Sequence, residues 1–101
     1  MKTLNHIKNK VLAYLPGSEV RLFGSRTRPN HDSESDYDIL VITNQRISVK
    51  EKLILKTRIR KGLLKENIRT DILIQSKKDI SVKKTLPGHI IRNIMNETIL
   101  L

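Results

Sequence analysis

The segment Tyr37–Thr43 is a run of almost uninterrupted aliphatic side chains, rich in the residue types that strands favour. Such a run has no polar face to turn toward water, so as a strand it must be covered on both sides. Segments with helical periodicity precede and follow it along the chain, and they can provide that cover. This segment therefore predicts a central strand in an α/β domain.

The rest of the chain reads as alternating helices and strands around that central strand. The first helix has helical apolar spacing and is stopped by Pro16-Gly17, and Ser48 with Glu51 forms a capping box for the second. The expected elements are a helix over Lys2–Leu15, a strand over Glu19–Phe23, the central strand, a helix to about Leu64, a strand over Ile68–Ile74 and a helix over Leu86–Leu101 that has Pro87 in its first turn. We expect a small mixed or parallel sheet with helices packed against it.

In the second helix, apolar and basic side chains are expected on opposite faces, one buried and the other exposed. The side chains expected to face inward are Val49, Leu53, Ile59 and Leu63. The basic exterior consists of Lys50, Lys52, Lys56, Arg58, Arg60 and Lys61.

A chain of 101 residues fits a single domain spanning residues 1–101. It has no cysteine, which excludes disulfides and thiolate metal sites and makes a cytoplasmic location the natural expectation. No stretch approaches the length of about 20 apolar residues that a membrane span needs, so we expect a soluble protein without membrane contact.

The formal net charge is +10, yet the acidic residues are concentrated in one place. Asp32, Glu34, Asp36 and Asp38 follow closely on Arg26 and Arg28. The excess positive charge either keeps a small protein soluble or attracts a polyanion such as a nucleotide, a nucleic acid or an acidic partner.

The candidate metal ligands are three aspartates at the start of aliphatic runs. Asp36 and Asp38 lie two positions apart, so on a strand both point to the same side. Asp71 lies in the next predicted strand, at the head of its aliphatic run, and if that strand neighbours the central one, the three carboxylates can converge. Taken singly, each aspartate can equally be a solvated strand end. Together, they can hold two Mg²⁺ ions in the arrangement used for nucleotidyl displacement.

The candidate phosphate-binding residues are Gly24 and Ser25, which directly follow the first predicted strand. Glycine lets a phosphate approach the backbone, and the following amides and the hydroxyl can donate hydrogen bonds to it. Arg26 and Arg28 add positive charge for a triphosphate. An ordinary turn with two solvated arginines is the alternative for this segment alone.

Taken together, these motifs resemble the minimal nucleotidyltransferases of the DNA polymerase β superfamily. The likeness rests on Gly24-Ser25, a short basic loop, Ser35-Asp36-Tyr37-Asp38 before an aliphatic strand, and Asp71 on a later strand. It covers nearly the whole chain. One position departs from the family pattern: Pro29 stands where a glycine is usual, and it removes an amide donor from the loop.

The resemblance implies a nucleotidyltransferase fold and a Mg²⁺-dependent enzyme that moves a nucleoside monophosphate, AMP from ATP in the first instance, to an acceptor hydroxyl. In that interpretation Asp36, Asp38 and Asp71 are catalytic and bind two Mg²⁺ ions, and Gly24, Ser25, Arg26 and Arg28 bind the triphosphate. Minimal members are similar to the antitoxins of two-gene modules, in which the acceptor is a tyrosine of a HEPN-domain toxin.

Two alternatives remain open at this stage. The chain can be a non-catalytic module that neutralises a partner by contact or binds nucleic acid through its basic helix, although its three aromatic residues make base stacking an unfavoured mode. An aminoglycoside nucleotidyltransferase shares the motif but usually has a further acceptor-binding domain. The apolar end Ile99-Leu100-Leu101 is covered either by an interface, which allows an oligomer, or by packing on the first helix.

Overall fold

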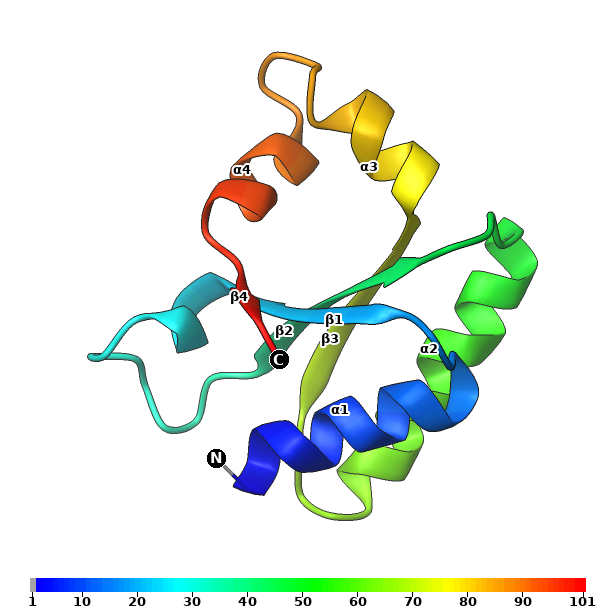
Figure 1. Cartoon of the computed structure of the whole chain (residues 1–101). Coiled ribbons are helices and arrows are strands. Elements are labelled where there is room, and N and C mark those ends of the chain that lie inside the picture. The colour runs from blue at the N-terminus through cyan, green and yellow to red at the C-terminus, as the bar shows by residue number, and fades with distance from the viewer. Residues whose placement is uncertain (1) are drawn as a thin grey trace.

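A mixed sheet lies between two layers of helices in the computed structural model, which describes residues 2–101 (Figure 1). The elements are α1 (Lys2–Tyr14), β1 (Glu19–Phe23), the 3₁₀ helix η1 (Gly24–Thr27), β2 (Tyr37–Thr43), α2 (Val49–Leu64), β3 (Thr70–Ser76), α3 (Lys77–Lys83), α4 (Ile90–Asn96) and β4 (Ile99–Leu100). The strand order is β3-β2-β1-β4, with β2 parallel to β3 and the other neighbours antiparallel. The expected α/β architecture with a small mixed sheet is confirmed.

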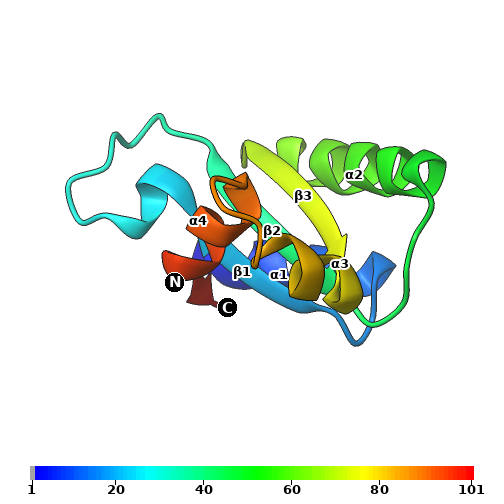
Figure 2. The ribbon, with the colours of Figure 1, turned by 90° about the horizontal axis from the view of Figure 1, so that it is seen from above.

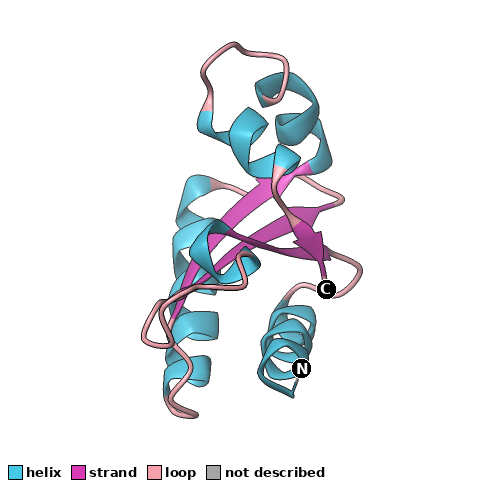
Figure 3. Ribbon diagram, turned by 90° about the vertical axis from the view of Figure 1, so that its left-hand side faces the viewer, coloured by secondary structure: helices cyan, strands magenta, loops and turns pink. Residues whose placement is uncertain are grey.

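Strand β2 is buried on both faces, as its sequence predicts. Ile39 and Val41 pack into a core shared with α1 and α2, whereas Leu40 and Ile42 pack into a second core shared with α3 and α4. Figure 3 shows these two helical layers on opposite sides of the sheet. Because side chains alternate along the strand, they contribute to both cores.

Helix α2 begins as predicted, and two of the four side chains expected to face inward do so. The side chain of Ser48 accepts a hydrogen bond from the backbone N–H of Glu51 at 3.1 Å. Ile59 and Leu63 are fully buried, whereas Val49 is 84% exposed and Leu53 is 64% exposed, so the inward orientation expected for these last two is wrong.

The helical period explains this error. At 100° per residue, Leu53 lies about 120° around the helix from Ile59. Leu55 lies much nearer to the Ile59 direction, and it is this side chain that packs against the core. The buried face of α2 is therefore narrower than the apolar pattern of the sequence indicates.

The C-terminal quarter differs most from the expectation of one long helix over residues 86–101. The third strand lies at Thr70–Ser76, two residues later than predicted, and α3 follows it directly. Helix α3 starts with a capping box between Ser76 and Asp79, which the sequence analysis overlooked.

Gly88, with φ of +74°, lies in the turn between the two short C-terminal helices, where the predicted single helix would have to run. A left-handed residue cannot continue a right-handed helix. After α4, Ile99 and Leu100 pair with β1 as an edge strand, and Leu101 packs against the core on the α1 side. Ile99 and Leu100 remain largely exposed. Among residues 2–101, none of the helices combines the length and apolar character that crossing a bilayer requires.

Candidate active site

The site is built around two aspartates on neighbouring strands. The parallel register of β2 and β3 places Asp38 opposite Asp71. Their next neighbours on the same face, Leu40 and Leu73, both pack toward the core under α3 and α4. Because side chains alternate along a strand, both carboxylates lie on this same face of the sheet. The second and third strands are thus neighbours, which is the condition that the convergence of the carboxylates required.

The electrostatics of Asp38 reflect this crowding. Partial burial raises the pKa of the Asp38 carboxyl, and the negative charges of Asp71 and then Asp36 raise it further. Among the described residues, no cationic side chain comes within ion-pair distance of Asp38 or Asp71. Like charges brought together in this way favour a bound cation, which would relieve the repulsion.

Asp36 lies just before β2 and is engaged by an arginine that the sequence analysis did not single out. The Nε atom of Arg69 is 3.5 Å from Oδ1 of Asp36, and Nη2 of Arg69 donates to the backbone carbonyl of Glu34 at 2.7 Å. Within residues 2–101 no three His, Cys, Asp or Glu side chains are arranged closely enough to hold a metal ion. The structure therefore brings Asp38 and Asp71 together and holds Asp36 beside them through Arg69.

The position of Arg69 follows once the register of the two strands is known. Extending the register of β2 and β3 one residue beyond Tyr37 and Thr70 places Asp36 opposite Arg69. The same offset separates Asp38 from Asp71, so the strand pairing that aligns the two acids also aligns this ion pair.

Gly24 forms the other wall of the site, where β1 passes into η1. Its φ is +76°, a left-handed conformation that favours glycine. A Cβ atom placed on Gly24 would overlap the carboxylate of Asp38. The preceding residue, Phe23, pairs with Asp38 in the sheet. The backbone of the Gly24 turn therefore lies directly against the Asp38 side chain.

Ser25 and Arg28 lie in and after the short turn that follows. The side chain of Ser25 is exposed next to Gly24, and its carbonyl accepts the backbone N–H of Arg28 at 3.1 Å. Thr27 Oγ1 donates to the Gly24 carbonyl at 2.7 Å, which stiffens the turn. Arg28 is itself exposed, so its charge is available to a ligand in solution.

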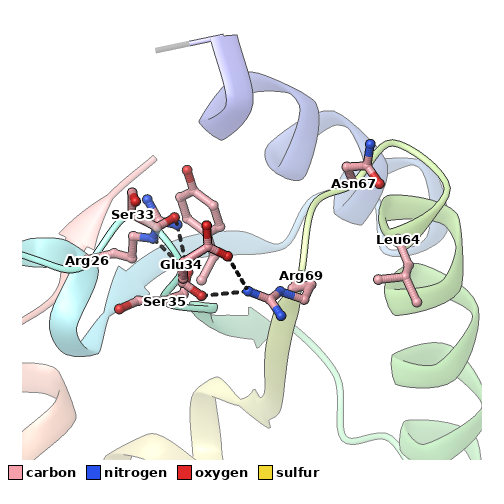
Figure 4. Close-up of a pocket in the computed structure, with 8 residues that line it drawn as sticks. Arg26, Ser33, Glu34, Ser35, Leu64, Asn67 and Arg69 are labelled. Atoms are coloured by element: carbon pink, nitrogen blue, oxygen red, sulfur yellow. Dashed lines mark hydrogen bonds and ion pairs between the residues drawn. The ribbon is translucent and has the colours of Figure 1, made fainter.

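Arg26 contacts the loop before β2 and stabilises it. Its guanidinium stacks 4.1 Å above the ring of Tyr37, and its Nη2 donates to the carbonyls of Ser33 and Ser35 at 2.8 and 2.7 Å. These bonds tie the loop before β2 to η1. Figure 4 shows Arg26 and Arg69 on the two sides of Glu34 in a pocket of about 430 Å³. That pocket is not lined by Asp38 or Asp71.

The sequence matches the nucleotidyltransferase domain family over residues 4–101, so the chain belongs to this family. No curated protein matches it by sequence. The fold is that of the minimal nucleotidyltransferases: one solved structure, a candidate minimal nucleotidyltransferase, superposes with a TM-score of 0.62 at 27% identity over 99% of this chain and 94% of that one.

Two further solved structures share the fold at lower identity. A candidate nucleotidyltransferase from Sulfolobus solfataricus gives a TM-score of 0.63 at 22% identity, covering 98% of this chain and 76% of that one. A complex of the tri-AMPylated HEPN toxin of Shewanella oneidensis with its MNT antitoxin gives 0.54 at 18% identity, covering 99% of this chain and 71% of the matched one. The predicted resemblance to minimal nucleotidyltransferases is confirmed.

Proposed function

We propose that this nucleotidyltransferase transfers AMP from ATP to an acceptor hydroxyl in a Mg²⁺-dependent reaction. The acceptor oxygen forms a bond to the α-phosphorus as the bond from that phosphorus to the pyrophosphate oxygen breaks. Pyrophosphate leaves, and the hydroxyl proton passes to a base, a role for which Asp71 is available. The observation that supports this proposal most is the pairing of Asp38 with Asp71 directly against the Gly24 turn.

The carboxylates of Asp36, Asp38 and Asp71 fit a pair of hard divalent cations. Carboxylate oxygens are ligands that Mg²⁺ prefers, and Asp38 and Asp71 have no protein cation beside them in the described chain. When bound, the two ions lower the pKa of the attacking hydroxyl and neutralise the departing pyrophosphate. Asp36 already has Arg69 as its positive partner, so it would exchange one cation for another.

The turn at Gly24 and Ser25 would bind the β- and γ-phosphates. Gly24 takes the left-handed backbone conformation of the turn, and its missing side chain leaves room for the Asp38 carboxylate beside the backbone. The Ser25 hydroxyl is exposed there as a donor. Arg28 adds positive charge to this side, while Arg26 holds the loop in shape through Ser33 and Ser35.

For the acceptor we propose a tyrosine of a HEPN-domain toxin, which would make the chain an antitoxin. The support is the shared fold with the antitoxin found in complex with the tri-AMPylated toxin of S. oneidensis. The nucleotidyltransferase domain family covers residues 4–101, so one small domain would both catalyse the transfer and bind the partner protein.

The test is incubation of the chain with ATP labelled on the α-phosphate, Mg²⁺ and a HEPN-domain protein encoded beside it. Label should appear on the partner with wild type and be lost by at least about a hundredfold in Asp36→Ala/Asp38→Ala, because metal ligands act in the transition state. The matched control is Glu66→Ala/Glu97→Ala, which removes two exposed acids outside the site.

Neutralisation by contact alone is the second candidate, and one observation favours it. Asp36 is held by Arg69, and no metal-holding trio is preformed among residues 2–101. If the double alanine variant still neutralised the toxin fully and no label moved with wild type, contact would be the mechanism.

A further inference from the structure

The loop between η1 and β2 leads into Asp36 without pairing to any strand. Figure 2 shows this loop projecting beyond the end of the sheet. Asp38 and Asp71 lie within β2 and β3, so the pairing of these two strands fixes their backbones. Asp36 lies just before β2, and its side chain is 55% exposed. The position of Asp36 therefore depends on contacts other than the strand pairing that holds the other two acids.

Two guanidinium groups hold the end of this loop. The carbonyls of Ser33 and Ser35 accept hydrogen bonds from Nη2 of Arg26 at 2.8 and 2.7 Å, and Nε of Arg26 donates to the Ser35 carbonyl at 2.9 Å. The carbonyl between them, that of Glu34, accepts from Nη2 of Arg69. Among the described residues, no backbone N–H donates to any of these three carbonyls. The two arginines thus supply the hydrogen bonds that a strand partner would otherwise provide.

Arg26 contacts the chain on both sides of Asp36. It donates to the carbonyl of Ser35, directly before Asp36, and its guanidinium stacks on the ring of Tyr37, directly after it. A planar guanidinium can make both contacts at once, because its N–H groups point outward in the plane while its face lies on the ring. The residues on either side of Asp36 are therefore fixed by one side chain.

Arg26 and Arg69 differ in what they do to the Asp36 carboxylate. Arg69 forms an ion pair with it, whereas none of the ion pairs in the described chain involves Arg26. A metal ion that replaced Arg69 at this carboxylate would leave the contacts of Arg26 in place. Arg26 can therefore support Asp36 both before and after a metal ion binds.

From these contacts we propose that Arg26 is a positioning residue, which holds the Asp36 carboxylate where it can bind a metal ion. It acts through the backbone of Ser35 and the ring of Tyr37. Its recorded hydrogen bonds go to loop carbonyls, so its role is not to supply charge to a triphosphate. This inference rests on the proposed Mg²⁺-dependent function and adds to it a residue that supports the metal site.

Replacing Arg26 by lysine separates positioning from charge. Lysine keeps the positive charge, but its ammonium group has no planar fork, so it cannot bond both carbonyls and stack on Tyr37 together. If Arg26 acted by its charge on the phosphates, Arg26→Lys would retain most of the function. If Arg26 positions Asp36, Arg26→Lys loses metal affinity although the charge is unchanged.

The test compares Arg26→Lys with Arg58→Lys, which makes the same change at an exposed arginine of α2 outside the site. Mn²⁺ affinity is measured by water-proton relaxation with a non-hydrolysable ATP analogue present. Affinity for the analogue alone is measured by calorimetry in EDTA. Circular dichroism at the same temperature establishes that each variant is folded.

Arg26→Lys should bind Mn²⁺ at least about tenfold more weakly than wild type, and should bind the analogue in EDTA within about threefold of wild type. Arg58→Lys should match wild type in both measurements. Wild-type Mn²⁺ affinity in Arg26→Lys would overturn the proposal. So would a loss of affinity for the analogue in EDTA as large as the loss of Mn²⁺ affinity, because the nucleotide would then be what Arg26 binds.

Chemical rescue of Arg26→Ala provides a second measurement. Arg26 lines a pocket of about 430 Å³, which leaves room for a small cation. Added methylguanidinium should restore Mn²⁺ affinity, and methylamine, which has the same charge, should not. In Arg26→Ala/Asp36→Asn methylguanidinium should have no effect on Mn²⁺ affinity, because Arg26 acts through Asp36. Equal restoration by the two additives, or restoration that persists without the Asp36 carboxylate, would overturn the proposal.

The labelling experiment separates this inference from the proposed function. If wild type labels its partner and Arg26→Lys binds Mn²⁺ as tightly as wild type does, the assignment of Arg26 alone fails. If Mn²⁺ affinity depends on Arg26 as expected but wild type transfers no label, the proposed AMP transfer fails and the positioning role stands.

Discussion

The carboxylate of Asp38 occupies the space into which a side chain at Gly24 would project. The two residues meet because Phe23, just before Gly24, pairs with Asp38 across β1 and β2. The Gly24 turn and the aspartate pair are consequently one structural unit. A change on either side of this contact should affect both metal and nucleotide binding.

Replacing Gly24 by alanine tests that contact. The Cβ would meet the Asp38 carboxylate, and the left-handed backbone adds strain of about 1–3 kcal/mol. We expect a lower melting temperature and at least about a tenfold loss of ATP affinity, measured by thermal unfolding and calorimetric titration. Gly88→Ala is the matched control: its φ is +74° but no atom lies within 4 Å, so it should lose stability and keep nucleotide binding. Similar nucleotide affinities in both variants would contradict the close-contact explanation.

Asp38→Asn should stabilise the fold at neutral pH. Burial and the neighbouring acids raise the pKa of Asp38 in the folded state, so its ionised form works against folding. The stability that protonated Asp38 contributes is complete below the unfolded pKa of 3.8 and is lost as pH rises through the raised folded value. The melting temperature of Asp38→Asn should therefore exceed that of wild type at pH 7, and the difference should disappear below about pH 4. An equal difference at both pH values would refute this electrostatic cause.

Removing Arg69 should strengthen Mg²⁺ binding in the presence of ATP. Arg69 is the cation now paired with Asp36, with side chains more than half exposed on both sides, so the pair adds about 0–1 kcal/mol to stability. We expect Arg69→Ala to bind Mg²⁺ about two- to fivefold more tightly, measured by Mn²⁺ or Mg²⁺ titration. Arg92→Ala, which removes an exposed arginine of α4, controls for net charge. Weaker binding in Arg69→Ala would show that the arginine positions Asp36 for the metal.

Shortening Ile39 measures the packing under the site. This side chain is fully buried in β2, so Ile39→Val should lower the free energy of unfolding by about 0.5–1.5 kcal/mol. The exposed Val49 provides the contrast, since Val49→Ala should change the free energy of unfolding by less than about 0.5 kcal/mol. Urea unfolding of both variants gives the comparison, and a larger effect at Val49 would mean that α2 turns the face originally expected toward the core.

Local sequence patterns were sufficient to predict the bounds of the strands next to the site. The bounds of β1 and β2 agree with the sequence prediction, because both strands lie between turn residues. In β1 charged and apolar side chains alternate, and β2 is mostly an apolar run. Helix α2 also ends at Leu64 as expected, and Ser48 caps its start. These features depend on neighbours within a few residues, which the sequence shows directly.

The errors lie where distant parts of the chain decide the structure. Helical spacing alone did not reveal that Ile99 and Leu100 complete the edge of β1, which lies far away in the sequence. It also did not show that α2 turns Leu53 outward, since that depends on how Ile59 and Leu63 pack against the sheet.

The sequence by itself determined the central strand, the Gly24 turn and the presence of three aspartates at the starts of strands. Only the tertiary structure decided that Asp38 and Asp71 face each other while Asp36 pairs with Arg69. The reason is that the pairing of β2 with β3 sets which side chains meet. A spacing along one strand defines a face, but the partner across the sheet follows from the register.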